Sequence, residues 1–334
     1  MTTVEEWLVL RPQGLYCIPG DFYIDPIDKV DAAIITHGHR DHAIAGHKKV
    51  LATPETIAIM QLRYGLDSTQ FWQKLAFGTR VTINQIKVLL LPAGHVLGSA
   101  QIVLEYKHKR VIISGDYKRR GDPTCAAFEV MPCDIFITEA TFGLPIFRHP
   151  AIQEEIGKLL QSLKKLSLCH LVGVYPLGKC QRLIKALREA NYHEPIYLHG
   201  ALFKLCHFYE SLNIHLGDLR QANTLNEKNA VGKIVLCPPS SLHDRWTRRF
   251  GEIVRANASG WMQIRARAKQ KGIDLPLIIS DHADWLELLQ TIDEVRPGEI
   301  WVTHGQEEAL VYSLLKKGYK AQALHLLGYE DSEE

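Results

Sequence analysis

Residues 32–42 read AAIITHGHRDH, an apolar strand that runs directly into three histidines and an aspartate within six residues. A loop that follows a strand can fold these side chains back onto one point. Imidazole and carboxylate groups without a thiolate suit zinc, with manganese or iron as competitors. A polar loop that carries histidines by chance is disfavoured, because three imidazoles and a carboxylate seldom share one turn without a cation. The first candidate ligands are His37, His39, Asp41 and His42.

Other segments repeat this pattern of a short apolar strand that ends at a polar residue, which is typical of an α/β sandwich. Residues 101–106 and 110–115 flank a short polar turn and predict an antiparallel hairpin. A helix is predicted over 54–64, since Thr53 can cap it, Pro54 suits its first turn and Gly65 follows its end. The further strands are predicted at 32–36, 110–114, 134–138, 275–280 and 300–303.

Between about residues 150 and 273 the chain alternates strands and helices with few acidic or histidine residues at the strand ends. This pattern predicts a separate α/β domain with a parallel sheet. The strands that end at Ser280 and Thr303 then return to the earlier pattern. We therefore expect a first domain made of residues 1–149 and 274–334, with a second domain, residues 150–273, inserted into it.

One loop cannot supply all the ligands of two metal ions, so further ligands are expected at the ends of other strands. His95 stands between glycines in the sequence PAGHVLGS, Asp116 follows a strand in SGDY, and His304 and His282 follow two later strands. Alone, each has an ordinary structural interpretation as a core histidine, a turn aspartate or a helix cap. Together, polar groups at several strand ends are expected to converge on one crevice of the fold.

These motifs resemble the β-CASP nucleases of the metallo-β-lactamase superfamily, a group that includes ribonuclease J, the polyadenylation endonuclease and the repair nucleases related to Artemis. More narrowly, the chain is similar to the bacterial DNA-ligase-associated exonucleases from about Trp7 to Leu327. The motifs that carry this resemblance are GLYC (14–17), GDFYIDP (20–26), ATPET (52–56), RYG (63–65), SGWM (259–262) and DHADW (281–285). The resemblance implies an αββα metallo-β-lactamase sandwich with an inserted β-CASP domain.

The resemblance also implies roles for individual residues. One metal would be held by His37, His39 and His95, a second by Asp41, His42 and His304, and Asp116 would bridge the two. The family places an acidic residue at Asp25 that orients the histidine cluster, and another at Glu139 that steadies the histidine at position 282.

Two divalent cations, zinc or manganese, can lower the pKa of a water that they share and stabilise charge on a phosphodiester. Asp41 could orient that water as it attacks, and His282 could protonate the departing sugar oxygen as general acid, because its carboxylate neighbour Glu139 favours the protonated form. Gly178 and Lys179 open a predicted helix where a phosphate could bind, and Ser280 is a third candidate for substrate binding. Pro176 stands where relatives commonly have a hydroxyl residue, so no phosphate contact is expected from the side chain at this position.

Composition sets wider limits. The 334 residues are 46% hydrophobic and 23% charged with a net charge of +2, which neither demands nor excludes a polyanionic partner. Seven scattered cysteines form no CxxC pair, so reduced structural thiols are expected. Neither a secretory signal nor an apolar stretch long enough for a membrane span is visible, so a cytoplasmic location is expected. Basic stretches at 118–120, 245–249 and 265–271 could follow a nucleic-acid backbone or could be solvated surface.

The leading hypothesis is a DNA exonuclease of DNA repair, with an ATP-dependent ligase and a helicase as partners implied by the resemblance. An RNA-processing nuclease of the same fold is the second hypothesis. A small-molecule hydrolase is a third, against which the insert and the Glu139 and His282 pair argue. A DNA-binding scaffold without catalysis is the fourth, and the complete ligand set argues against it.

Overall fold

The computed structural model describes residues 3–325, and the chain divides into two units. The first unit contains the residues up to Ile146 and those from His282 onward, and the second is Phe147–Asp281. The second unit is therefore an insertion between two parts of the first. The last residues of the expected segment 274–334, which are 326–334, lie outside the described residues.

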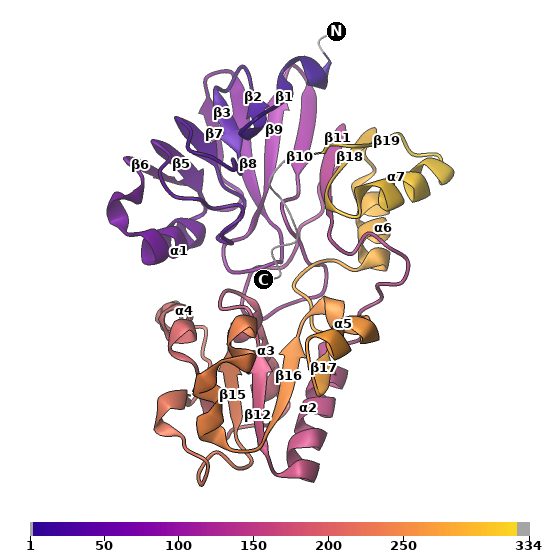
Figure 1. Cartoon of the computed structure of the whole chain (residues 1–334). Helices are drawn as coiled ribbons and strands as arrows, with labels where there is room; N and C mark the ends of the chain where they lie inside the picture. Colours follow the sequence, from indigo (N-terminus) through magenta and orange to yellow (C-terminus); the bar gives the residue numbers. More distant parts are fainter. Residues whose placement is uncertain (1–2, 326–334) are drawn as a thin grey trace. The chain divides into compact units, whose positions relative to one another are not determined.

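Within residues 3–325, the first unit contains two sheets of six and seven strands (Figure 1). The first sheet has the order β1 (Leu8–Arg11), β2 (Gly14–Cys17), β3 (Phe22–Ile24), β4 (Ala32–Ile34), β5 (Lys49–Ala52) and β6 (Phe71–Lys74). The second has the order β19 (Ala321–Ala323), β18 (Glu299–Gly305), β11 (Ile135–Ala140), β10 (Lys109–Ile113), β9 (Ala100–Tyr106), β8 (Ile86–Pro92) and β7 (Arg80–Ile83).

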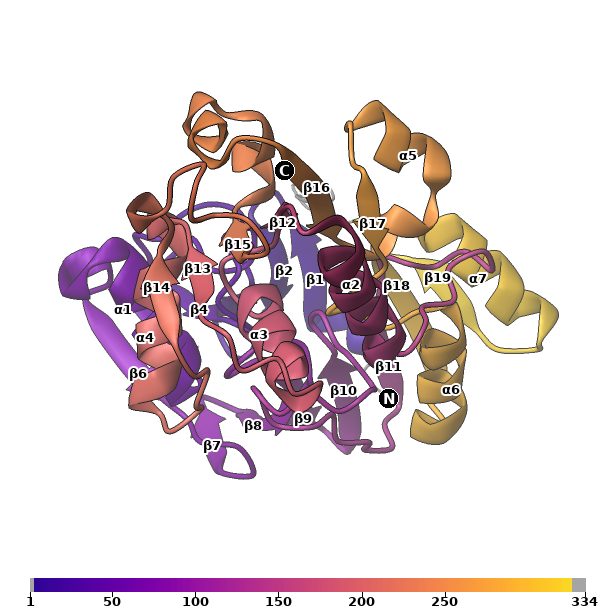
Figure 2. The same cartoon turned by 90° about the horizontal axis from the view of Figure 1, so that it is seen from below.

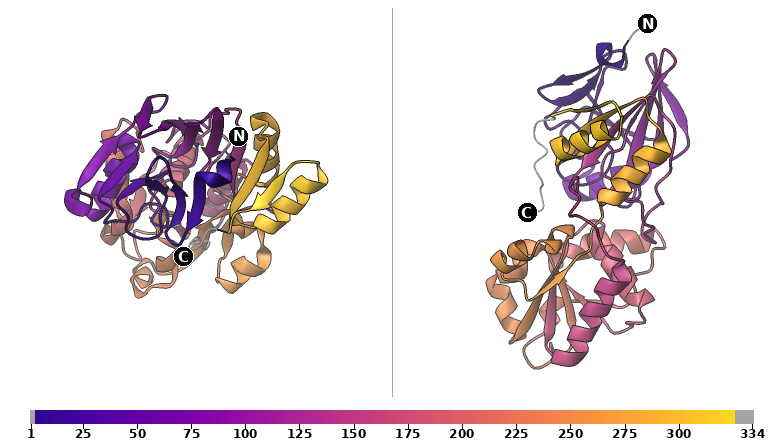
Figure 3. Two further views of the ribbon diagram at one scale, coloured as in Figure 1. Left: turned by 90° about the horizontal axis from the view of Figure 1, so that it is seen from above. Right: turned by 90° about the vertical axis from the view of Figure 1, so that its right-hand side faces the viewer.

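Apolar side chains fill the space between the two sheets, because alternate residues of each strand face inward. Leu15 and Ile34 of the first sheet belong to the same buried cluster as Ile102 and Val111 of the second. Helix α1 (Pro54–Tyr64) covers the outer face of the first sheet. Helices α6 (Trp285–Val295) and α7 (Glu307–Lys316) cover the outer face of the second sheet (Figure 3). The four layers form the expected αββα sandwich.

Local sequence explains two of these elements. Helix α1 begins after Thr53, whose Oγ1 accepts a hydrogen bond from the Thr56 amide at 3.2 Å, and Gly65 ends it with φ 91°. The predicted hairpin of β9 and β10 is confirmed by antiparallel pairing. Its turn residues Lys107 and His108 both have positive φ, 45° and 64°, as a tight two-residue hairpin turn requires.

The second unit is built on a sheet whose strands all pair in parallel, which confirms the parallel sheet predicted for the insert (Figure 2). Its order is β14 (Leu219–Gln221), β13 (Ile196–Leu198), β15 (Ile234–Cys237), β12 (Cys169–Gly173), β16 (Ile253–Ala258) and β17 (Leu275–Leu277). Its α-helices are α2 (Ile152–Leu166), α3 (Lys179–Glu189), α4 (Gly200–Ser211) and α5 (Arg265–Gln270).

The strand predicted at 275–280 does not return to the first domain. Residues Leu275–Leu277 form β17, which pairs in parallel with Ala256–Ala258 of β16 in the second unit. The chain re-enters the first unit at His282, eight residues later than the predicted boundary at residue 274. An apolar strand suits either sheet, and only its pairing partner decides between them.

The described cysteines are all free thiols, as expected. Within residues 3–325, no helix has both the length and the apolar character that crossing a bilayer would require.

His47 couples the stability of the first unit to pH. Its Nδ1 lies 3.3 Å from the amide of Val30 and accepts its hydrogen bond, which requires that this nitrogen is unprotonated. Burial lowers the pKa of His47 to about 4, from an ordinary value of 6.5. Below pH 6.5 the unfolded chain therefore binds a proton at His47 that the folded chain does not bind. The contribution of His47 to the free energy of unfolding is fully present above pH 6.5 and is lost as the pH falls toward 4.

We expect the free energy of unfolding to fall by up to about 1.4 kcal/mol per pH unit from this group between pH 6.5 and 4. His47→Asn removes the titration and should flatten this part of the profile. Denaturant unfolding at several pH values measures both slopes, with the exposed His108→Asn as the control. Parallel profiles for the wild type and His47→Asn would contradict the prediction.

Candidate metal centre

The first cluster of candidate ligands lies in the loop after β4, and its backbone is anchored on both sides. Before the cluster, the Thr36 amide donates to Asp25 Oδ1 at 2.7 Å. Within the cluster, the guanidinium of Arg63 in α1 donates to the carbonyl of Gly38 at 2.7 Å. The loop therefore presents its imidazoles from a backbone that two other elements hold in place.

The loop around His95 is also held by hydrogen bonds. The Ser99 hydroxyl accepts from the amides of His95 and Val96 at 3.1 and 3.2 Å. The Thr53 hydroxyl, at the start of α1, donates to the carbonyl of Gly98 at 2.7 Å. Helix α1 thus contacts both loops that carry candidate ligands.

Asp116 follows β10 through a glycine that allows two loops to touch. Gly115 has φ 54°, and a Cβ on it would lie 2.8 Å from the Cβ of Thr36. A larger residue would push the Asp116 loop away from the first cluster, so the sequence SGD is needed for close approach as well as for its carboxylate.

His304 sits on an irregularity between β18 and β11. Thr303 pairs with Glu139, but Gly305 pairs with Ala140, so His304 is an extra residue in β18. It has φ 58°, in the left-handed region that few side chains adopt. Such a bulge breaks the alternation of a strand and re-aims a side chain. The position of this candidate ligand therefore depends on strand register.

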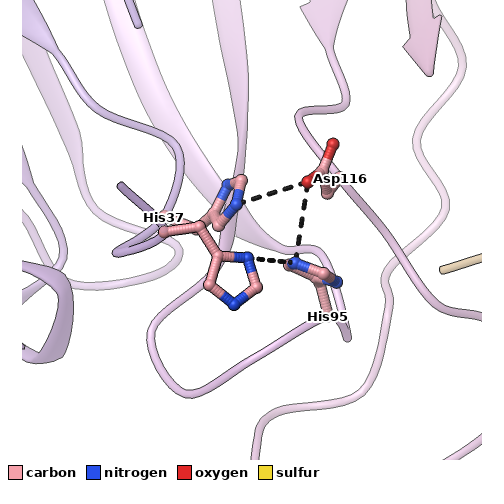
Figure 4. A group of neighbouring side chains, drawn as sticks. His37, His95 and Asp116 are labelled. Carbon is pink, nitrogen blue, oxygen red and sulfur yellow. Dashed lines mark hydrogen bonds and ion pairs between the residues drawn. The ribbon is translucent and has the colours of Figure 1, made fainter. Parts of the chain in front are cut away.

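The side chains meet around one carboxylate oxygen. The Nε2 atoms of His37, His42 and His95 lie 3.4, 3.5 and 3.6 Å from Asp116 Oδ2. Figure 4 shows His37 and His95 pointing toward Asp116. His39 joins them, since its Nδ1 lies 3.0 Å from His95 Nε2. Two nitrogens on one tetrahedral zinc are separated by roughly 3.3 Å, so the spacing of His39 and His95, with His37 and Asp116 beside them, fits ligands of a single ion.

The other candidates lie on the His42 side of the same cluster. Asp41 Oδ2 is 3.7 Å from His42 Nε2, and the ring of His304 stacks on that of His42 with centroids 5.2 Å apart. The structure thus brings the predicted ligands of both metals together. Ligand atoms of His37, His39, His95 and Asp116 all lie within 4.8 Å of one another, so the cluster can hold a divalent cation. The assignment of each ligand to one of two ions stays a prediction.

The charges within the cluster compensate one another. Burial works against the charged form of His42, but the carboxylates Asp116, Asp41 and Asp25 raise its pKa to about 10. Burial alone would raise the pKa of Asp41, but the neighbouring histidines, His42 first, lower it to about 2. His42 and these carboxylates therefore stabilise one another's charged forms inside the buried cluster.

His95 and His304 favour the opposite state. Burial lowers the pKa of His95 well below its ordinary value, and the neighbouring histidines lower it further. Burial and the charge of His42 lower the pKa of His304 to about 4. Both imidazoles are neutral at pH 7 and carry the lone pairs that a metal requires.

Asp25 supports the cluster from behind. Its Oδ2 lies 2.8 Å from Nδ1 of His42, while Nε2 of the same ring faces Asp116. Its other oxygen accepts from the Thr36 amide. A carboxylate that takes the rear nitrogen of a ligand imidazole fixes both its tautomer and its orientation. The contact agrees with the orienting role predicted for Asp25.

Glu139 and His282 form a second pair beside the cluster. Glu139 Oε2 lies 2.9 Å from His282 Nδ1, and its Oε1 accepts from the Tyr117 amide at 2.7 Å. The ring of His282 lies 4.6 Å from the ring of His95. The structure therefore brings Glu139 and His282 next to the metal cluster that contains Asp41, the third predicted catalytic residue, although His282 comes 143 residues after Glu139.

The predicted substrate-binding residues belong to the second unit. Gly178 precedes α3 and its amide donates to Gln181 Oε1 at 2.8 Å. The Lys179 ammonium is buried, 3.8 Å from Asp281 Oδ2, and the Ser280 carbonyl accepts from Arg182 at 2.9 Å. These polar groups have partners inside their own unit, and their role in binding stays a prediction.

One predicted basic stretch is not a free surface. Lys118 pairs with Glu287 at 3.0 Å, Arg119 pairs with Glu294, and Arg120 pairs with Asp284 at 2.7 Å. Paired cations are poor candidates for following a phosphate backbone.

Sequence reasoning missed the residues that hold the site together, Thr36, Arg63, Ser99 and Lys118. Arg63 lies in the RYG motif and Lys118 directly follows SGDY, but the motifs did not show that these two side chains hold the loops of the site. No local pattern distinguishes them from surface residues.

We expect Asp25→Asn to lower metal affinity by about 10- to 100-fold, because an amide cannot hold the rear nitrogen of His42 as a carboxylate does. Competition with a chromophoric chelator measures this affinity. Asp31→Asn, which alters a surface pair with Lys48, is the matched control. Equal affinities of Asp25→Asn and wild type would contradict the orienting role.

Comparison with known families matches residues 25–167 to the metallo-β-lactamase superfamily. A protein of Opitutus terrae named probable DNA ligase is 29% identical over 330 residues, which cover 95% of this chain and 31% of that protein. Cleavage and polyadenylation specificity factor subunit 3 of Dictyostelium discoideum is 29% identical over 58% of this chain and 30% of its own length. An RNase J-like protein of Methanocaldococcus jannaschii is 26% identical over 61% of this chain and 56% of its own length.

The chain thus spans between about a third and a little over half of these relatives. Among solved structures, a protein of unknown function from Enterococcus faecalis V583 matches with a TM-score of 0.60 and 12% identity, over 90% of this chain and 80% of that one. This likeness concerns the fold alone.

Proposed function

We propose that this chain, which belongs to the metallo-β-lactamase superfamily and to its β-CASP type, is a metal-dependent nuclease that degrades DNA from its ends. The observation that carries the proposal is the pairing of Glu139 with His282 beside a buried cluster of histidines around Asp116. Hydrolysis at a metal needs a ligand set, and expulsion of a sugar oxygen needs a proton donor. The first unit contains residues that can fill both roles.

Two divalent cations, zinc or manganese, would be held by the ligand set and would supply the Lewis acidity that activates water and stabilises charge on the phosphate. His37, His39 and His95 would hold one cation and Asp41, His42 and His304 the other, and Asp116 would contribute to both; the side chains lie close enough together for these roles.

The residues of the chain have separate tasks in the reaction. The partly exposed carboxylate of Asp41 orients the attacking water. His282, held through Nδ1 by Glu139, gives the proton on its Nε2 to the sugar oxygen as the phosphorus–oxygen bond breaks. That oxygen leaves as a neutral hydroxyl group. The oxygen of the water stays on the phosphate, one proton of the water is released to solvent, and His282 then takes up a proton from solvent to return to its starting state.

Similarity over 95% of the chain to a protein named probable DNA ligase favours DNA as the substrate and DNA repair as the process. An ATP-dependent DNA ligase and a helicase are the proposed partners, and the cytoplasm is the proposed location. RNA processing is the second candidate, because several relatives are named endoribonuclease or RNase J-like protein.

The proposal predicts shortening of DNA that carries a free end, in the presence of zinc or manganese. Matched single-stranded DNA and RNA, labelled separately at their 5′ and 3′ ends, distinguish the two substrates and the direction of cleavage. His39→Ala should lose metal and activity together, and the exposed His108→Ala is its control. Strong preference for RNA would make RNA processing the function, and hydrolysis of thioesters without nuclease activity would replace both.

We expect His282→Ala to keep its metals and to lower kcat on DNA by roughly 10²- to 10⁴-fold, the usual contribution of a general acid. Metal content by elemental analysis and steady-state kinetics test the two halves of this prediction. Loss of metal would instead identify His282 as a ligand.

Arg40 offers a cation next to the ligands. It is exposed between His39 and Asp41, and within residues 3–325 it takes part in no ion pair. We expect Arg40→Ala to raise KM for DNA about tenfold, or about 1.4 kcal/mol, through loss of a phosphate contact. Arg40→Lys, which keeps the charge, should show a smaller rise. An unchanged KM for Arg40→Ala would show that phosphate does not bind there.

A further inference from the structure

Lys118 is a buried cation two residues after Asp116. Its side chain is only 2% exposed. Its ammonium donates to Glu287 Oε2 at 3.0 Å and to the backbone carbonyl of His282 at 2.8 Å. Burying an ammonium is costly unless it is paired and hydrogen-bonded, and here both conditions are met. One of the two groups that satisfy the buried ammonium is the backbone of residue 282, which ties Lys118 to a predicted catalytic residue.

Lys118 and its neighbour hold both polar atoms of a single peptide group. The carbonyl of His282 accepts from Lys118, and the amide of Ala283, in the same peptide, donates to the carbonyl of Tyr117 at 2.7 Å. The Tyr117 amide in turn donates to Glu139, which holds the His282 imidazole. The backbone and the side chain of His282 are therefore both tied to the two residues that follow Asp116.

Other charges keep Lys118 in place. Glu287 Oε2 also accepts from the Asp284 amide, and Asp284 caps α6 by accepting from the amide of Glu287. Arg120 pairs with both carboxylates, at 2.7 Å to Asp284 and 3.2 Å to Glu287. The network thus links the start of α6 to the loop after β10.

The backbone of Lys118 also contacts the His95 loop. Its amide donates to the carbonyl of Ala93 at 3.0 Å, and a Cβ on Gly94 would clash with its carbonyl oxygen. The neighbours of Lys118 therefore include the loops of His95, Asp116 and His282, which are far apart in the sequence.

We infer that Lys118 is a positioning residue, whose ammonium holds the 282–283 peptide so that the His282 imidazole reaches the substrate at the metal centre. The inference rests on the proposed function, in which His282 is the general acid. The chain topology gives a reason for such a residue, because His282 is the first residue after the second unit. The clamp fixes His282 to the first unit at the point where the chain returns to it.

The role of Lys118 can be tested with two substrates that differ in their leaving group. Expelling a sugar oxygen from DNA needs a proton, whereas bis(4-nitrophenyl) phosphate releases a stable phenolate that needs little protonation. We expect Lys118→Met to lower kcat on single-stranded DNA about 10- to 100-fold with KM within about twofold. Its turnover of the aryl diester and its metal content should match the wild type. Lys109→Met, which removes a surface pair with Asp134, should behave as wild type on both substrates.

A double-mutant cycle separates positioning from general weakening of the fold. If Lys118 acts through His282, Lys118→Met should add nothing to the loss caused by His282→Ala. Because methionine removes one of the two cations that pair with the buried Glu287, the double variant Lys118→Met with Glu287→Gln is measured in parallel and should show the same contrast between substrates.

An unchanged kcat on DNA for Lys118→Met, an equal loss on both substrates, or additive losses in the cycle would each overturn the inference and leave the proposed function standing. A wild-type chain that binds metal and cleaves neither substrate would overturn the proposed function, and the inference with it.

Discussion

Three buried imidazole nitrogens surround a single oxygen of Asp116 at 3.4 to 3.6 Å, and much of the first unit depends on that arrangement. Placing so many polar groups in a dry interior is costly unless their charges balance. The balance comes from carboxylates that raise the pKa of His42 and from burial that keeps His95 and His304 neutral. The same donors and charges make the cluster suitable for divalent cations.

The ligands come from loops of several elements, so their convergence depends on packing between those elements. Helix α1 contacts two of these loops, through Arg63 to Gly38 and through Thr53 to Gly98. Gly115 lets the Asp116 loop approach the first cluster. The apolar core between the sheets thus contributes to chemistry, because it sets the distances between loops that have no local reason to meet.

A second set of contacts connects this cluster to the residue proposed as proton donor. Glu139 contacts both His282 and the Tyr117 amide, and Lys118 contacts the His282 backbone. Catalytic groups must be held within a fraction of an ångström of their productive geometry. Such anchoring matters all the more because His282 directly follows the inserted second unit. The peptide bond to the preceding residue does not by itself hold His282 in the first unit.

Local patterns of apolar, turn or capping residues were enough to predict the fold class, the parallel sheet of the insert, the hairpin of β9 and β10, and helix α1. The sequence also identified the candidate ligands, since histidines and aspartates at strand ends are rare enough to stand out. Only the tertiary structure decided which sheet takes Leu275–Leu277, because an apolar strand can pair in either. Strand register likewise decided that His304 is a bulged residue. The basic stretch at residues 118–120 shows the reason most clearly. Its positive charges are visible in the sequence, but the burial of Lys118 and the acidic partners of the stretch depend on residues 164 to 175 positions away. Contacts at such a separation leave no local pattern in the sequence.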